Sequence, residues 1–195
     1  MIDFTGFTKE KLTIDLVWAN VFGLLILLPI VIIYGLPYFL IWGDSLSDFS
    51  FGNVFHTIQE QYFGNSLHVV LYLLGGIIAH ELIHGIFWSL FAEHGFNSIR
   101  FGVMWKMLTP YCHCKEPLQI KHYIIGALMP AVILGLFPAI VGIAIGDLGM
   151  VIFGGFFTLA AAGDFLIINL LKKESMNDLV QDHPTEAGCF VYRKA

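Results

Sequence analysis

Near the start of the chain, residues 16–42 form a long apolar stretch without Asp, Glu, Lys, Arg or His. A bilayer hydrocarbon core about 30 Å thick is crossed by roughly 20 apolar residues in a helix. The whole chain has the same character, since 57% of its residues are hydrophobic and 13% are charged, whereas soluble domains carry about 25% charged residues. We therefore expect an integral membrane protein whose partner is the lipid bilayer.

Three further apolar stretches are long enough to cross a membrane, at residues 67–92, 123–145 and 150–171. Pro130 and Pro138 predict kinks in the second of these. The fold class expected is an all-α membrane protein with about four transmembrane helices, organised as a single domain over residues 1–195. No run of basic residues indicates a nucleic-acid partner.

The basic residues indicate how the chain is oriented. Cytoplasmic loops of membrane proteins are enriched in Lys and Arg. With four spans, all ten basic residues fall on one side, and the loops 43–66 and 146–149 contain none. The expected localisation is a multi-pass cell membrane protein with both termini in the cytoplasm. The ten residues are Lys9, Lys11, Arg100, Lys106, Lys115, Lys121, Lys172, Lys173, Arg193 and Lys194.

The second span contains the zinc-peptidase pattern H-E-x-x-H, as His80, Glu81 and His84. Residues four apart on a helix lie on one face, about 6 Å apart along the axis. His80 and His84 can therefore bind one Zn²⁺ ion, and Glu81 is expected to act as general base for a zinc-bound water. A carboxylate within a span is costly and indicates function, although a polar patch joining helices is the alternative.

Zinc peptidases use three protein ligands and leave a fourth position for water. Asp164 is the remaining clearly buried ionisable residue of the expected spans, and it lies at a depth similar to that of His80 and His84. We therefore predict Asp164 as the third ligand, brought close by the small residues 160–163. The alternative is a helix-packing carboxylate, or one that is hydrogen-bonded to a ligand histidine.

These residues resemble those of the bacterial "putative zincin peptidase" family, formerly classed as a domain of unknown function. The likeness covers roughly residues 70–192 and rests on five motifs. More distantly, the chain is similar to the site-2 protease class of intramembrane metalloproteases, which pair H-E-x-x-H with an Asp ligand on a later helix. The resemblance implies a zinc peptidase fold. The motifs are His80-Glu81-Leu82-Ile83-His84, Pro110-Tyr111-Cys112, Pro130, Gly163-Asp164 and Asp182-His183-Pro184.

Two cytoplasmic segments have patterns of their own. Residues 98–107 alternate between apolar and mostly polar or small side chains, which predicts a strand in a small hairpin between spans two and three. Such a strand could hold an extended substrate by β-augmentation, or could simply cover the site. Cys112, Cys114, Cys189 and His183 could assemble a second metal site, although loop packing is the simpler reading. His183 is also a candidate for supporting the catalytic site.

The function expected is intramembrane proteolysis, with a membrane protein or membrane-adjacent peptide as substrate. The alternative is a divalent-metal transporter or sensor that uses the same ligands. Glu81 favours the peptidase, because a transport site gains nothing from a carboxylate in the general-base position. A transporter should also carry polar residues along its other spans, and spans one and three have almost none. A non-catalytic scaffold is a third reading, against which the intact motif argues.

Overall fold

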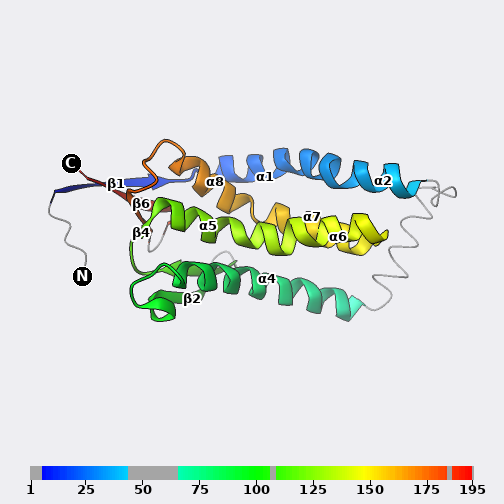
Figure 1. Cartoon of the computed structure of the whole chain (residues 1–195), viewed down its shortest axis with the longest axis horizontal. Coiled ribbons are helices and arrows are strands. Elements are labelled where there is room, and N and C mark those ends of the chain that lie inside the picture. The colour runs from blue at the N-terminus through cyan, green and yellow to red at the C-terminus, as the bar shows by residue number, and fades with distance from the viewer. Residues whose placement is uncertain (1–5, 44–65, 106–108, 184–185, 195) are drawn as a thin grey trace. The chain divides into compact units, whose positions relative to one another are not determined.

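The computed structural model describes residues 6–43, 66–105, 109–183 and 186–194. The chain forms two compact units, which are built from interleaved segments. Unit 1 comprises Met1–Phe22, Glu81–Pro130 and Ala161–Ala195, and unit 2 comprises Gly23–His80 and Ala131–Ala160. Because neither unit is one continuous segment, no single linker divides the chain, and the single domain stays a prediction. Figure 1 shows the elements in chain order.

Unit 2 is helical and has a small buried core. Its first apolar segment consists of three consecutive helical pieces: α1 (Leu16–Ile30), the π turn η1 (Val31–Gly35) and α2 (Leu36–Trp42). The others are η4 (Ala131–Leu136), α6 (Phe137–Ile145) and α7 (Leu148–Ala160). Buried polar tips are paired, since Tyr34 Oη lies 3.0 Å from Thr158 Oγ1 and Trp42 donates to the carbonyl of Ile143.

Both π turns are followed by a proline in the second position of the next helix, Pro37 in α2 and Pro138 in α6. Proline has no N–H to donate and its ring clashes with the carbonyl of the preceding turn. A wider π turn accommodates this defect without ending the helix. The kink predicted at Pro138 therefore takes the form of a π segment.

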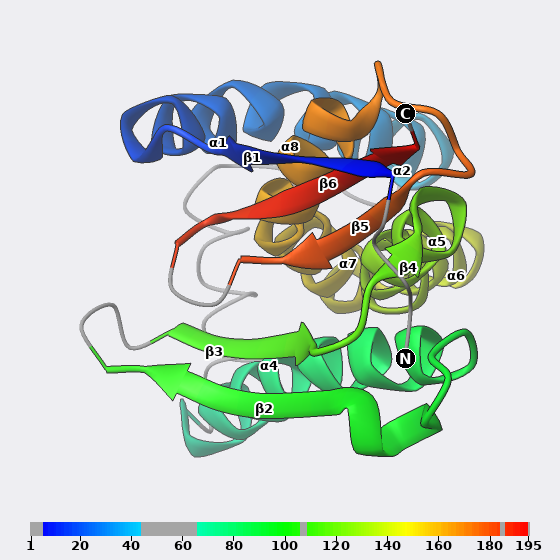
Figure 2. The ribbon, with the colours of Figure 1, turned by 90° about the vertical axis from the view of Figure 1, so that its left-hand side faces the viewer.

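Unit 1 contains a four-stranded antiparallel sheet in the order β1-β6-β5-β4 (Figure 2). The strands are β1 (Phe7–Thr13), β4 (Leu118–Gln119), β5 (Leu179–Asp182) and β6 (Gly188–Lys194). Phe7 is paired with Lys194 and Thr13 with Gly188, so the first strand of the chain lies against the last. This sheet was not predicted from the sequence, and all-α is too narrow a description of the fold.

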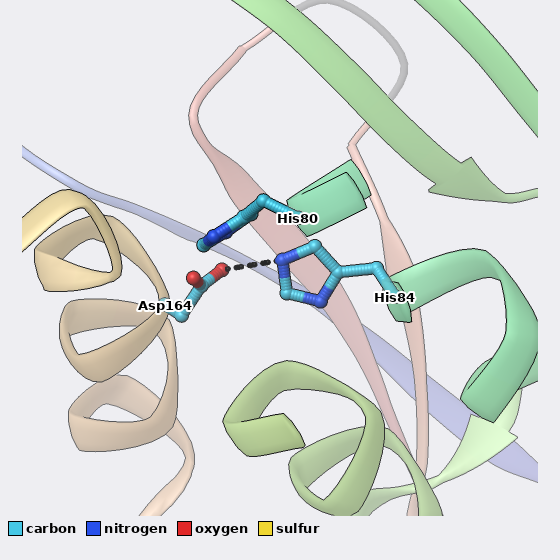
Figure 3. Close-up of side chains that lie close together, drawn as sticks. All are labelled: His80, His84 and Asp164. Atoms are coloured by element: carbon cyan, nitrogen blue, oxygen red, sulfur yellow. Dashed lines mark ion pairs between the residues drawn. The ribbon is translucent and has the colours of Figure 1, made fainter. Parts of the chain in front are cut away.

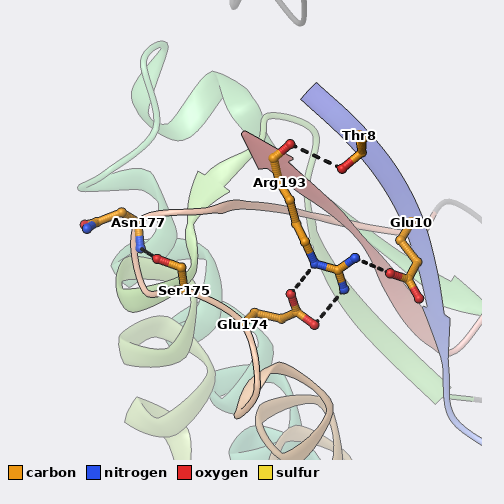
Figure 4. A network of polar contacts seen from close by, with 6 residues as sticks. All are labelled: Thr8, Glu10, Glu174, Ser175, Asn177 and Arg193. Carbon is orange, nitrogen blue, oxygen red and sulfur yellow. Dashed lines mark hydrogen bonds and ion pairs between the residues drawn. The ribbon is translucent and has the colours of Figure 1, made fainter. Parts of the chain in front are cut away.

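Arg193 of β6 forms hydrogen bonds with two other parts of unit 1, the segment after α8 and the strand β1 (Figure 4). Its guanidinium makes two hydrogen bonds to the Glu174 carboxylate, at 2.6 and 2.8 Å, and a third to Glu10 of β1. The hydrogen bonds from Arg193 lower the pKa of Glu174. A bidentate pair of this kind holds the segment after α8 against the sheet.

The predicted hairpin is present. Strands β2 (Ile99–Met104) and β3 (Thr109–Cys114) form an antiparallel pair with Ile99 opposite Cys114. The short 3-10 helix η3 (Gly95–Ser98) precedes it. Residues 106–108, which include Lys106, lie outside the described part of the chain, as does most of the loop 43–66. The strand predicted over 98–107 is thus confirmed for 99–104.

The predicted catalytic and metal residues lie on two helices, α4 (Ser66–Ser89) and α8 (Ala162–Leu171), and a third helix, α5 (Ile120–Pro130), supports them. In unit 1, the end of α4 packs with α5, α8 and the sheet around a common core. This core includes Trp88, Tyr123, Leu171, Val180 and Val191. The sheet therefore holds the ends of these helices together.

Three helical stretches in the described part of the chain are apolar and long enough to cross a membrane, Val17–Trp42, His68–Ser89 and Ile120–Ile145. They correspond to the first three predicted spans. The fourth predicted span, 150–171, is instead a pair of helices, α7 and α8, bent by 43°. Three or four spans are therefore compatible with the fold, depending on whether this bent pair counts as one.

Candidate metal centre

The predicted metal ligands of α4 are buried, and they point to one side of the helix. His80 and His84 are 8% and 4% exposed, and their four-residue spacing places them one turn apart. One ring nitrogen of His80, one ring nitrogen of His84 and one carboxylate oxygen of Asp164 all lie within 4.8 Å of one another (Figure 3). Among the described residues, these three form the one group of His, Cys, Asp or Glu side chains that could hold a metal ion.

Asp164 owes its position to the break between α7 and α8. Ala161 departs from helical backbone with φ −76° and ψ 7°, and α8 begins at the next residue. Asp164 therefore lies in the first turn of α8, where the helix dipole favours a negative charge. Its Oδ1 atom lies 3.3 Å from His84 Nε2, and its side chain is 22% exposed. The sequence predicted this partner but not the break that presents it.

His84 uses its two ring nitrogens differently. Nδ1 lies 2.9 Å from the backbone carbonyl of Gly126 in α5, and Nε2 faces Asp164. A carbonyl only accepts, so Nδ1 must carry the proton and donate it. This leaves the lone pair of Nε2 for a metal ion, in the arrangement that commonly orients metal-binding histidines.

Aromatic stacking supports the His84 ring. Trp88 stacks on it with the ring centroids 4.9 Å apart, and Tyr123 stacks on Trp88 at 5.0 Å. The Trp88 indole N–H donates to the Tyr123 carbonyl at 3.0 Å. The rotamer of His84 is therefore held by packing as well as by its hydrogen bond. The sequence showed these aromatic residues only as part of an apolar span.

Asp182 connects this aromatic stack to the sheet. Its carboxylate accepts hydrogen bonds from Tyr123 Oη at 2.5 Å and from the backbone N–H of Cys114 at 3.0 Å. Burial raises the pKa of Asp182. Asp182 belongs to one of the motifs that suggested the resemblance, and here it joins β5 to β3 and α5. Nothing in the sequence indicated these partners.

Glu81 follows His80 on α4 and is half-buried. Burial raises the pKa of the Cys112 thiol, and the Glu81 carboxylate raises it further. Glu81 directly follows the predicted ligand His80, and Gly85, one turn further along α4, lies against Phe101 of the hairpin.

The donor set suits zinc. Two neutral imidazole nitrogens and one carboxylate oxygen are the ligand types of catalytic zinc sites, which keep a fourth position for water or substrate. The His84 hydrogen bond to Gly126 supplies the outer support that such ligands usually have. His80, His84 and Asp164 are thus the residues that would hold the ion.

Within the part of the chain that the structure describes, the cysteines and His183 do not form the second metal site considered above. Cys114 and Cys189 are buried in the core of unit 1, and Cys112 packs beside them. Burial raises the pKa of Cys114 to about 11 and that of Cys189 to about 12. His183 accepts a hydrogen bond from the backbone N–H of Glu186 and contacts Phe190. Loop and core packing account for these residues.

A comparison with protein families matches residues 73–178 to the family described as "Putative zincin peptidase". The match covers just over half of the chain and includes His80, Glu81, His84 and Asp164. Zinc is the cofactor that this family implies, and a metallopeptidase is the activity that its description suggests. No curated protein and no solved structure matches the chain. The extent of the match shows that the chain belongs to the putative zincin peptidase family.

Proposed function

We propose that this protein is an integral membrane zinc metallopeptidase that cleaves membrane or membrane-adjacent peptide segments. The observation that carries the proposal is that His80, His84 and Asp164 lie close enough together to bind one metal ion. Glu81 lies beside His80 on α4. Three of these four residues, His80, Glu81 and His84, come from a helix that is apolar and long enough to cross a membrane. Polar clusters in such helices are functional by default.

When bound, zinc would acidify a water molecule and polarise the peptide carbonyl. The chain's own residues do the rest. Glu81 accepts the proton that the attacking water loses, and it delivers this proton to the amine that leaves when the C–N bond breaks. The Nδ1–H of His84, held by Gly126, keeps the imidazole in one tautomer throughout.

The membrane orientation is proposed from the basic residues of the predicted spans. Both termini and the hairpin β2–β3 would be cytoplasmic. The pairing of β1 with β6 supports placing both termini on one side, because strands joined in one sheet must lie on the same side of a membrane. Labelling of single-cysteine variants tests the orientation: an impermeant reagent should reach probes in 43–66 and miss probes at 1–10 and 180–195.

The substrate would be bound in an extended form. The hairpin is a two-stranded sheet, so each strand has one edge outside the ladder that could add a substrate strand. Helical carbonyls are shielded by their own hydrogen bonds, so segments weakened by Gly or Pro near the cut should be preferred. Cleavage toward the cytoplasmic end of the segment is expected, because the hairpin belongs to that side.

The proposal is tested by adding transmembrane peptides to the purified protein in liposomes and mapping the products by mass spectrometry. We expect cuts within or next to the membrane segment, which a zinc chelator abolishes and added Zn²⁺ restores. Zinc binding without hydrolysis of any peptide would favour the transporter or sensor instead. Cuts confined to soluble, outward-facing domains would refute the intramembrane assignment.

A further inference from the structure

The hairpin β2–β3 has two chemically different faces. Ile99 and Phe101 lie against Gly85 of α4, and Phe101 and Val103 remain exposed apolar side chains. Arg100 pairs with His113 across the strands, so both point to the opposite face. Tyr111 and Lys115 follow the same alternation. One face is thus apolar and the other carries three basic side chains.

The basic face of the hairpin forms one wall of a cavity of about 310 Å³ in unit 1. Arg100, Tyr111, His113 and Lys115 contribute from the hairpin side. The opposite wall comes from the sheet, through Gln181 and Asp182 of β5 and Phe190 of β6. Gln181 donates to the Lys115 carbonyl at 2.6 Å and so bridges the walls at one point. Figure 2 shows β3 and β5 next to each other.

The positive charges of this cavity are available to a ligand. Within the described part of the chain, no carboxylate forms an ion pair with Arg100 or Lys115. The one acidic residue of the lining is Asp182, whose two oxygens already accept hydrogen bonds from Tyr123 and Cys114. A ligand carboxylate would therefore meet two exposed cations and a histidine.

A strand edge runs beside the cavity and leads toward the proposed site. The N–H of Lys115 donates to the carbonyl of Ser98, the residue just before β2, whereas the N–H of Cys114 points away from β2, to the Asp182 carboxylate. Backbone groups alternate along an antiparallel strand, so the N–H and C=O of Cys112 also face away from β2. Cys112 pairs with Phe101, whose ring lies against Gly85, the residue after His84 on α4.

From these observations we infer that the cavity is a subsite for an acidic side chain of the substrate, which pairs with the outer edge of β3. The peptide backbone would pair with Cys112 while a Glu or Asp side chain, a few residues from the scissile bond, enters between Arg100 and Lys115. This inference rests on the proposed peptidase function and names its preferred substrate class as acidic extended segments.

A peptide fits this site better than a lipid headgroup or a free anion. The apolar face of the hairpin, with Phe101 and Val103 exposed, is the one suited to a bilayer, and the cavity lies on the other face. Tyr111, Phe190 and Gln181 add aromatic and amide surface that inorganic phosphate would not use. The edge at Cys112 offers a donor and an acceptor side by side, as a peptide backbone requires.

Binding is measured without turnover, using the full-length Glu81→Gln protein in detergent and fluorescence anisotropy. The probe is a labelled eight-residue peptide with two Glu residues separated by one position, so that both lie on one face. Its control carries Gln at both positions. We expect the Glu peptide to bind about fivefold more tightly or better, because each partly exposed ion pair contributes modestly.

Three variants make the test specific. Arg100→Glu with Lys115→Glu should remove the preference and instead favour a peptide with Lys in place of Glu, which also shows that the variant is folded. Lys173→Glu, an exposed lysine outside the cavity, should leave the preference unchanged. Phosphatidylglycerol vesicles and inorganic phosphate serve as competitors, and neither should displace the peptide at matched charge concentration.

Equal affinity for the Glu and Gln peptides would overturn the inference. So would a preference that survives the double charge reversal, or complete competition by vesicles or phosphate. Hydrolysis assays separate this inference from the proposed function. Charge-dependent binding without hydrolysis by wild-type protein would contradict the peptidase, and hydrolysis without charge-dependent binding would contradict the subsite alone.

Discussion

His84 Nε2 lies 3.3 Å from Asp164 Oδ1, although the two residues are 80 positions apart in the chain. Each would be a ligand of the same ion, and His80 would supply the third. A distance of this size suits two ligands that converge on one metal, whose bonds to nitrogen and oxygen are about 2.0–2.2 Å long.

Removing any one ligand should lower zinc occupancy. Asp164→Ala, His80→Ala and His84→Ala are each expected to lower zinc affinity by more than the roughly 10–100-fold loss that follows removal of an outer partner. Metal analysis of the purified proteins measures this, with Asp178→Asn as a carboxylate control outside the cluster. Wild-type zinc binding by Asp164→Ala would show that Asp164 is not a ligand.

Gly126 should matter to zinc binding although its side chain is a hydrogen. A Cβ atom there would lie 2.2 Å from the Trp88 ring, which stacks on His84, and the Gly126 carbonyl accepts the His84 proton. Gly126→Ala is expected to weaken zinc binding about 10–100-fold. Gly163→Ala is the control, because its Cβ would meet nothing within 4 Å. Similar zinc affinity in both variants would show that Gly126 does not support His84 as a zinc ligand.

Close helix packing in unit 2 predicts a contrast between neighbouring glycines of α7. A Cβ on Gly154 would lie 2.4 Å from the Gly135 carbonyl oxygen, whereas a Cβ on Gly155 would lie 3.6 Å from its nearest neighbour, Ile30. Gly154→Ala should destabilise the protein by about 1–3 kcal/mol, as overpacking does. Gly155→Ala should be neutral or slightly stabilising. Thermal melts in detergent compare the two.

The Arg193–Glu174 pair predicts a pH dependence of stability. Its hydrogen bonds hold the pKa of Glu174 below the ordinary value of 4.5. The pair therefore stabilises the fold above that value, and the contribution is lost as the pH falls through the lowered pKa. Glu174→Gln should reduce the melting temperature at pH 7, and its difference from wild type should disappear in acid. A difference that persists there would assign the effect to packing.

Much of the site follows from the sequence because local rules determine it. The spacing of His80 and His84 depends only on helix geometry, and the cost of a carboxylate in an apolar span singles out Asp164. The outer partners could not be predicted in this way. Gly126 acts through its backbone carbonyl, and the role of Trp88 depends on stacking between helices that are far apart in sequence.

The sheet of unit 1 was missed for a different reason. The strand β1 is seven residues long and mostly exposed, and its partner β6 lies at the other end of the chain. Such pairing is a long-range contact that no local pattern specifies. From the sequence, Lys9 and Lys11 indicated only that the positively charged side of the membrane lies before the first span. The only apolar residues of Phe7–Thr13 are Phe7 and Leu12, whose spacing of five does not fit the period of two expected for a strand, so no local pattern marked this segment.

The most direct measurement compares Glu81→Gln with wild type for zinc content and hydrolysis of one transmembrane peptide. The amide keeps the shape of the side chain but cannot accept a proton, and Glu81 is not among the proposed ligands. We predict unchanged zinc content and a loss of hydrolysis of about 100-fold or more, the scale of general base catalysis. Full hydrolysis by Glu81→Gln with zinc bound would contradict the proposed mechanism.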